Sequence, residues 1–403
     1  MPFIWTALHT YGGNLGIKGN LSRINAIPFE APPLSPAPAG YDPRTQAVGV
    51  GYTPEGLDQN TAYYELLQEA AFKAAPEKNL TDWLVERAHR RYGLLGGGGR
   101  NADVTAAWAA LGASGYAIDK GVSDATGVCR MGVPSDLKGL DRSNFEADLK
   151  TPRAPLCLEW SSWGSLNKAA PAVVAAAAAA GQQLPETFVY DLVNTAREVL
   201  AQLSTPMLLN FSASLNSSSG GGGGGGAGAT GALYIELLGD LERLLATDTA
   251  FMLGPWLASA RTLGGSATDC VDTQIAGDIG NCADFMEWNA RAQLTSWYPV
   301  IGSASAPVVQ QGGRDHDYAR KQWSGLLRDV YIPRAELYMK QAKADAAAGR
   351  AFDSAAAAQS YAHLSYQWQT GYPSEYPTEP EGGAVAVSTE LRLKWAPYFS
   401  DCP

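Results

Sequence analysis

The stretch AVGVGYTPEG, residues 47–56, decides the fold. It is a short apolar run that ends in Thr-Pro-Glu-Gly, and this composition predicts a buried strand closed by a turn. A second run of strand length, PFIWTALH at residues 2–9, also ends at turn residues. Residues 28–43 between the runs hold six prolines and predict a loop. Residues 60–75 carry apolar side chains at helical spacing, so the order of these elements predicts a β/α unit.

Beyond residue 78 the sequence changes to helical patterns. In residues 184–203 the apolar side chains form one continuous stripe, and Pro185 suits a first helical turn. A run of seven glycines, Gly220–Gly226, predicts a flexible loop over residues 214–230. The predicted domains are therefore a β/α part, residues 1–78, and an all-α part, residues 79–403. Helices are predicted at residues 80–92, 103–111, 168–180, 184–203, 231–246, 248–263, 282–297, 317–348 (bent at Pro333) and 355–370.

Composition excludes several classes of function. The 403 residues carry a net charge of −10, without the basic stripe that nucleic acid requires. No apolar stretch is long enough to span a membrane, and no signal peptide is visible. The four histidines are too scattered for a zinc motif, and no G-x-S-x-G sequence is present. We therefore expect no metal or cofactor. The chain opens directly on a predicted strand, so we also expect an upstream portion to be missing.

Five cysteines lie far apart in the sequence, at positions 129, 157, 270, 282 and 402. Cys270 and Cys282 flank a loop-like stretch and can form a disulfide in an oxidising compartment, or remain as buried thiols. Four N-x-Ser/Thr sequons, beginning at Asn20, Asn79, Asn210 and Asn216, permit glycosylation in a secretory protein.

Carboxylates and aromatic side chains remain in quantity, and together they suit glycoside hydrolysis. Glu55 stands out because it follows a predicted strand directly and lies between a rigid proline and a permissive glycine. In β/α barrels, catalytic side chains project from such strand ends. The alternative is an ordinary glutamate in a tight turn.

Several motifs resemble family 89 glycoside hydrolases, the α-N-acetylglucosaminidases. PFIWTALHTYGGNLGIKG (residues 2–19) resembles the family signature PFIW-x-x-LH-x-x-GGN-x-G, and GVGYTPEGLDQN (residues 49–60) resembles G-x-G-x-x-PEG-x-x-QN. Further matches follow in the family's order, so that the resemblance covers almost the whole chain. They are WLVERAHRRYG (83–93), FVYDLVNTAREVL (188–200), FMLGPWLASAR (251–261), EWNARAQLTSW (287–297), DYARKQWSGLLRDVYIPR (317–334) and LRLKWAPYF (391–399).

The resemblance implies an α+β fragment: the last strands of a (β/α)8 TIM barrel followed by a mainly α-helical domain. It also implies a retaining exo-glycosidase that removes terminal α-linked N-acetylglucosamine from glycans without a cofactor. Glu55 corresponds to the family's nucleophile. Trp297 and Tyr318 correspond to aromatic pocket residues, and Trp5 and His9 border the pocket. For each aromatic side chain the alternative is a place in the hydrophobic core. The family is typically lysosomal or secreted, and the oligomeric state is not predicted.

Two departures from the family pattern limit this prediction. The family's acid/base glutamate belongs to an earlier barrel strand, and its pocket histidine has no equivalent in residues 113–156. Other acids, such as Glu159 and Glu287, do not lie in the right motif to replace the missing acid. A retaining site needs two carboxyl groups about 5–5.5 Å apart. The alternatives are a non-catalytic helical module that binds sugar or protein, and a glycosidase with a different sugar preference.

Overall fold

A computed structural model describes most of the chain, and the contacts between its residues define two compact units. Unit 1 comprises residues 1–129, 152–199 and 388–403, and unit 2 comprises residues 130–151 and 200–387. The described residues are 3–7, 16–30, 47–54, 60–94, 100–117, 153–217, 224–264, 281–295, 301–303, 306–308, 321–373 and 375–403.

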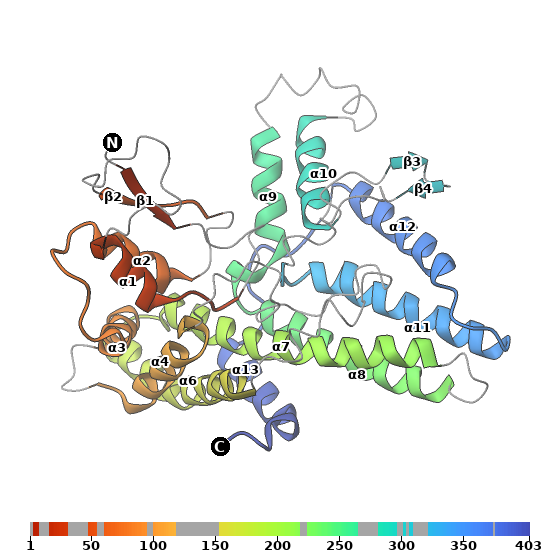
Figure 1. Ribbon diagram of the computed structural model, residues 1–403. Helices are drawn as coiled ribbons and strands as arrows, with labels where there is room; N and C mark the ends of the chain where they lie inside the picture. The colour runs from red at the N-terminus through yellow and green to blue at the C-terminus, as the bar shows by residue number, and fades with distance from the viewer. Residues whose placement is uncertain are drawn as a thin grey trace. The chain divides into compact units, whose positions relative to one another are not determined.

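Unit 1 begins with two parallel strands and two helices (Figure 1). Strand β1 (Phe3–Ala7) pairs with β2 (Ala47–Tyr52), as the two apolar runs predict. Helix α1 (Leu21–Glu30) lies between the strands in sequence, and α2 (Thr61–Ala70) follows them. Both helices contact β2, so this part of the chain is a βαβα arrangement with a crossover between parallel strands. The sequence did not predict α1, whose last residues overlap the predicted loop at 28–43.

Helices build the remainder of unit 1. Asn79 and Asn101 cap α3 and α4, because their side chains accept hydrogen bonds from backbone N–H groups of the first turn. The predicted apolar stripe from Phe188 to Leu203 is buried along α7. The elements are α3 (Leu80–Arg91), α4 (Ala102–Ala113), the 3-10 turn η3 (Gly115–Ala117), α6 (Arg153–Ala179) and α7 (Glu186–Ser217), of which α7 continues into unit 2 beyond residue 199.

The C-terminal segment belongs to unit 1 from residue 388 onward. It contains most of α13 (Ala384–Lys394) and the 3-10 turn η10 (Ala396–Phe399). Its contacts are with α6: the Trp163 Nε1 donates to the Ser388 hydroxyl at 2.7 Å, and the rings of Trp160 and Phe399 stack. These contacts attach the end of the chain to a helix more than 200 residues earlier.

The cysteine pairing differs from the expected one. Cys157 in α6 forms a disulfide with Cys402 near the C-terminus. Cys282 is a free thiol, which excludes the Cys270–Cys282 disulfide and agrees with the alternative of unpaired thiols for this residue. Cys270 itself lies outside the described residues. Short sequence spacing suggested the wrong pair, whereas the fold brings together two cysteines that are 245 residues apart.

Unit 2 is built of paired helices with one small hairpin, β3–β4. Figure 1 shows α9 beside α10, and α11 running along α8, in agreement with their contacts. Among the described residues, no helix is long and apolar enough to cross a membrane. The elements are α8 (Gly224–Leu245), the 3-10 turn η6 (Thr249–Phe251), α9 (Leu253–Gly264), α10 (Cys282–Thr295), β3 (Ile301–Ser303), β4 (Ala306–Val308), the π-helix η9 (Leu327–Tyr331), α11 (Ile332–Ala347) and α12 (Ser354–Thr370).

Two local predictions in unit 2 need correction. The loop predicted at 214–230 is shorter, because α7 extends to Ser217 and α8 already begins at Gly224. Packing between the helix ends overrides the low helix propensity of glycine: the Ser214 hydroxyl lies 2.8 Å from that of Thr230. The helix predicted at 317–348 is divided into η9 and α11 close to Pro333. Pro333 lies in the first turn of α11, directly after η9, where no N–H is needed.

Candidate active site

The predicted site residues are described only in part. Trp5 lies in β1 and is half-buried. The others lie outside the described residues: Glu55, His9, Trp297 and Tyr318. Their roles therefore stay predictions. The structure does describe β1 and β2, the strands that precede His9 and Glu55 in the sequence.

The two strands end side by side. Ala7, the last residue of β1, lies opposite the last residue of β2. The N–H of Thr53 donates to the carbonyl oxygen of Ala7 at 3.0 Å, which extends the ladder by one residue. Pro54 has no N–H with which to continue it. Because the strands are parallel, both end at the same edge of the sheet. The next ionisable residue in the sequence is His9 after β1 and Glu55 after β2.

The two faces of the strand pair differ. Tyr52 faces α2, since Gln68 Nε2 donates to its hydroxyl at 2.8 Å. Side chains alternate along a strand, so Trp5 shares the face of Tyr52 through the paired register. Thr6 and Gly51 form the opposite face, where a Cβ added to Gly51 would lie 3.3 Å from the Thr6 hydroxyl. Trp5 thus lies on the helix side of the strands, and its predicted place beside the sugar stays a prediction.

Residues 16–18, which we call the anchor segment, rejoin the fold after the connection that follows β1. They have no regular secondary structure but are buried. The side chain of Asn60 binds both ends of the segment: its Nδ2 donates to the first carbonyl oxygen at 2.8 Å, and its Oδ1 accepts from the last N–H at 2.9 Å. Glu198 Oε2 accepts from the middle N–H at 2.9 Å. The Gly16 carbonyl oxygen and the N–H groups of Ile17 and Lys18 therefore all have side-chain partners from distant parts of the chain.

Glu198 is fully buried and is accompanied by a cation. Arg197 Nη2 donates to its Oε2 at 2.9 Å, and neither side chain is exposed. Asn194 Oδ1 accepts from Nε and Nη2 of the same arginine, at 3.0 and 2.7 Å. A buried ion pair is tolerated only when hydrogen bonds satisfy its remaining polar atoms, as these do. The first half of α7 therefore offers a fixed carboxylate to the anchor segment.

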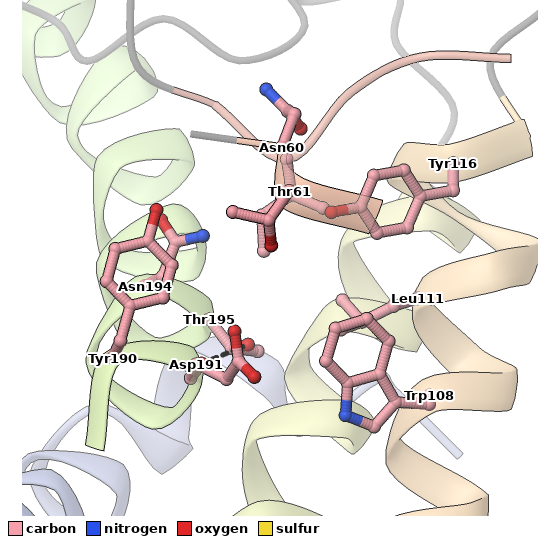
Figure 2. Close-up of a pocket in the computed structure, with 10 residues that line it drawn as sticks. Asn60, Thr61, Trp108, Leu111, Tyr116, Tyr190, Asp191, Asn194 and Thr195 are labelled. Atoms are coloured by element: carbon pink, nitrogen blue, oxygen red, sulfur yellow. Dashed lines mark hydrogen bonds between the residues drawn. The ribbon is translucent and has the colours of Figure 1, made fainter. Parts of the chain in front are cut away.

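A small pocket adjoins Asn60 and the anchor segment (Figure 2). It has room for about one water molecule, far less than a sugar ring needs. Figure 2 shows side chains from the start of α2, from α4 and from α7 converging on it. The lining residues are Ile17, Asn60, Thr61, Trp108, Leu111, Tyr116, Tyr190, Asp191, Asn194 and Thr195. This pocket lies beside Asn60 and the anchor segment and is too small to hold a sugar ring.

Asp191 is the carboxylate in the lining of this pocket. Its carboxylate accepts from the Tyr92 hydroxyl at 2.9 Å and from Arg91 Nε at 3.2 Å. Burial, and then the Asp191 charge, raise the pKa of Tyr92 well above its ordinary value. Burial likewise raises the pKa of Tyr116. Both phenols therefore remain protonated over the range of pH in which proteins work, so that Tyr92 acts as a hydrogen-bond donor to Asp191.

Glu287 and Glu159 are the other acids considered from the sequence, and both are buried; Glu242 was not singled out there. Glu287 is buried in unit 2 and pairs with Arg291 at 2.8 Å and with Arg261 at 2.9 Å. Glu159 is buried in α6. Glu242 accepts from the backbone N–H of Gly325 at 2.8 Å, and burial raises its pKa. Within the described ranges no group of three or more His, Cys, Asp or Glu side chains is arranged to hold a metal ion.

The fold and the strand ends define a class: the closing β/α part of a TIM barrel followed by a helical domain. Two family models match the chain. The α-N-acetylglucosaminidase (NAGLU) tim-barrel domain matches residues 1–74, and the NAGLU C-terminal domain matches residues 83–394. The chain therefore belongs to the α-N-acetylglucosaminidase family. The predicted fold class is confirmed, while the predicted boundary at residue 78 stays a prediction.

Similar proteins agree with this assignment. The α-N-acetylglucosaminidase of Homo sapiens is 28% identical over 399 residues, which are 99% of this chain and 46% of the human protein. A family 89 glycoside hydrolase from Clostridium perfringens, solved with 2-acetamido-1,2-dideoxynojirmycin, has a TM-score of 0.70 at 22% identity. That match covers 98% of this chain and 39% of the bacterial chain. A variant of the bacterial protein with two glutamates changed to glutamine, in complex with its substrate GlcNAc-α-1,4-galactose, also has a TM-score of 0.70 at 21% identity. This chain thus spans less than half the length of these relatives.

Two residues of the site region were not singled out from the sequence. Asn60 and Glu198 were visible only as parts of the matched motifs GVGYTPEGLDQN and FVYDLVNTAREVL. Their position inside those motifs was a signal, but no local pattern indicated that both hold the backbone of residues 16–18. That relation depends on contacts across 42 and 181 residues of sequence.

Proposed function

We propose that this chain supplies the nucleophile half of a retaining exo-glycosidase acting on terminal α-linked N-acetylglucosamine, with Glu55 as the nucleophile. One observation carries the proposal: the ladder between β1 and β2 ends at Thr53, so Glu55 follows at the carboxyl edge of two parallel strands. Catalytic groups of β/α barrels are placed at this edge. Membership of the α-N-acetylglucosaminidase family supports the choice of sugar.

The proposed reaction is a double displacement. A carboxylate oxygen of Glu55 attacks the anomeric carbon, the glycosidic C–O bond breaks, and an acid protonates the departing oxygen. Water then attacks the same carbon and gives its proton to the acid's conjugate base. The bond between that carbon and Glu55 breaks, and the sugar leaves with its original configuration. The acid/base group is not identified among the residues of this chain. The solved substrate complex of the bacterial relative, with its two Glu-to-Gln changes, supports a reaction with two carboxyl groups.

Binding roles follow the family resemblance. Trp297 and Tyr318 hold the N-acetylglucosamine ring, and Trp5 and His9 border the pocket. The partner is a glycan that ends in this sugar, and the reaction needs no cofactor. The Cys157–Cys402 disulfide supports an oxidising compartment, so we propose a lysosomal, vacuolar or secreted location and glycosylation at the exposed sequons.

A mechanism-based fluorosugar tests the assignment of the nucleophile. A 5-fluoro glycosyl fluoride of N-acetylglucosamine should label Glu55, as located by peptide mass spectrometry. Glu55→Gln should lower turnover of an aryl α-N-acetylglucosaminide by on the order of 10⁴-fold or more. The matched control is Glu86→Gln, which should keep full activity. The Glu86 carboxylate is half exposed and, within the described residues, pairs only with Arg100. Labelling at another residue would overturn the assignment.

The second candidate is a non-catalytic helical module that binds sugar or protein. One observation favours it: the buried acid Glu287 is held by two arginines and offers no replacement for the missing acid/base. Turnover by the purified 403-residue chain decides between the two. Activity that Glu55→Gln abolishes rules out the non-catalytic module, and binding of N-acetylglucosamine without turnover supports it.

A further inference from the structure

The anchor segment is held by three other parts of unit 1. Asn60, at the start of α2, binds both of its ends, and Glu198 of α7 binds its middle N–H. Gly115 packs so closely that a Cβ added to it would overlap the carbonyl oxygen of Ile17. The backbone of residues 16–18 is thus fixed by hydrogen bonds on two sides and by steric contact on a third.

Asn60 does not serve as an ordinary helix cap. Asn79 and Asn101 each use the side-chain oxygen to accept N–H groups of their own helix. Asn60 stands at the same position before α2 but makes no such bond. Its backbone is left-handed, with φ of 53°, a conformation that asparagine tolerates better than most residues. The residue is 2% exposed, and both hydrogen bonds of its side chain are made to the anchor segment.

The contact between Asn60 and the anchor segment matters because each of them follows a strand end in the sequence. The chain that leaves β1 at Ala7 and carries His9 returns to the described structure at residue 16. The chain that leaves β2 at Pro54 and carries Glu55 returns at Asn60. The amide of Asn60 therefore ties the far end of one strand-end connection to the far end of the other. Their near ends are already joined by the hydrogen bond from Thr53 to Ala7.

We propose that Asn60 is a positioning residue, which ties residues 16–18 to the start of α2, the described ends of the two segments that carry His9 and Glu55, with Glu198 as its support. The effect on catalysis rests on the proposed function of Glu55, whereas the effect on the two connections does not. A nucleophile must meet the anomeric carbon in a narrow geometry, and a displacement of about 1 Å can cost on the order of 10²-fold in rate.

Asn60→Gly provides the test, because glycine accepts the left-handed backbone and removes only the amide. Hydrogen exchange of the intact protein should become at least about 10-fold faster in peptides that cover residues 8–18 and 53–60, since both lose the same tie. In turnover of the aryl substrate, kcat should fall by about 10- to 100-fold while KM changes by less than about threefold. The control is Asn101→Gly, which removes a helix cap in unit 1 and should change neither peptide.

Each outcome has a separate meaning. Unchanged exchange in both peptides, or a change confined to one of them, would refute the tie between the two connections. Faster exchange in both peptides with an unchanged kcat would refute the positioning role. If Glu55→Gln leaves turnover unaffected, the proposed function fails, and the exchange data still decide the tie. Should Asn60→Gly not fold, Asn60→Asp, which keeps the acceptor oxygen but loses the donor to Gly16, is measured in the same two ways.

Discussion

The two units use buried polar side chains for different purposes. In unit 1, Asn60 and Glu198 bind the backbone of an irregular segment next to the strand ends. In unit 2, Glu287 of α10 binds Arg261 of α9 and Arg291 of its own helix. Arg291 also donates to the carbonyl oxygen of Trp368 at the end of α12. Buried polar side chains therefore hold the anchor segment in unit 1, whereas the Glu287 cluster joins helices in unit 2. We expect damage at the anchor segment to affect activity and damage at the Glu287 cluster to affect stability.

Removing the arginine of the unit 2 cluster should have the largest effect on stability. Arg291→Ala leaves Glu287 buried with part of its compensation lost. It also removes the arginine donor to the Gly371 carbonyl oxygen and one of two donors to that of Trp368. We expect the free energy of unfolding to fall by about 3–5 kcal/mol, measured by urea denaturation. Arg100→Ala breaks two ion pairs whose partners are about half exposed, so its effect should be far smaller than that of Arg291→Ala. Equal effects of the two variants would contradict the comparison.

The disulfide is the covalent link within unit 1. Cys402→Ser removes the covalent link between the C-terminal segment and α6. Because the closed loop is long, the free energy of unfolding should fall by about 2–5 kcal/mol. Thermal melting in oxidising buffer measures this loss. Cys282→Ser removes a free thiol and should leave the melting temperature nearly unchanged. A reductant should lower the melting temperature of the wild-type protein and of Cys282→Ser, and leave that of Cys402→Ser unaffected.

Two glycines allow a matched test of the comparison. A Cβ on Gly115 would overlap the Ile17 carbonyl of unit 1, and a Cβ on Gly254 would overlap the Pro377 carbonyl of unit 2. Each change to alanine should cost about 1–3 kcal/mol, because backbone has to move. Only Gly115→Ala displaces the anchor segment, so only this variant should also lower kcat with the aryl substrate. Loss of kcat in both variants at equal stability would show that the anchor segment is not special.

The smallest effect concerns the pH dependence of unit 2. The backbone N–H of Asp353, the Gln341 amide and Arg350 all donate to Asp345 and lower its pKa to about 2. The folded value lies below the unfolded one, so its contribution is complete above about pH 4 and is lost as the pH falls through about 2. Urea midpoints between pH 5 and about pH 2 should therefore decline more steeply in the wild type than in Asp345→Asn. Parallel curves would exclude this role.

Much of the fold could be predicted from the sequence because its signals are local. The apolar runs at residues 2–9 and 47–52 became β1 and β2, and the apolar stripe of residues 188–203 became the buried face of α7. Helix α1 was missed because Pro28 and the prolines after it indicate a loop, although the structure continues the helix to Glu30. The helical end of the glycine run, Gly224–Gly226, was missed for a similar reason, since tertiary contacts outweigh propensity there.

The candidate site was less accessible to prediction. Glu55 could be selected from its place after a strand and from a motif, and it remains a prediction. The supports around it could not be selected, because a side chain that binds distant backbone leaves no periodic pattern. Asn60 looks like a helix cap in the sequence, and Glu198 looks like one acid among the polar residues of a helix.

The sequence by itself determined the order of strands and helices, the family and the residue at the end of β2, since these depend on neighbouring residues and on motif order. Only the tertiary structure decided which cysteines pair, which glycines face a carbonyl and which side chains hold the anchor segment. Those relations join residues from 42 to 245 positions apart. They depend on how the backbone folds back on itself, which local preferences do not specify.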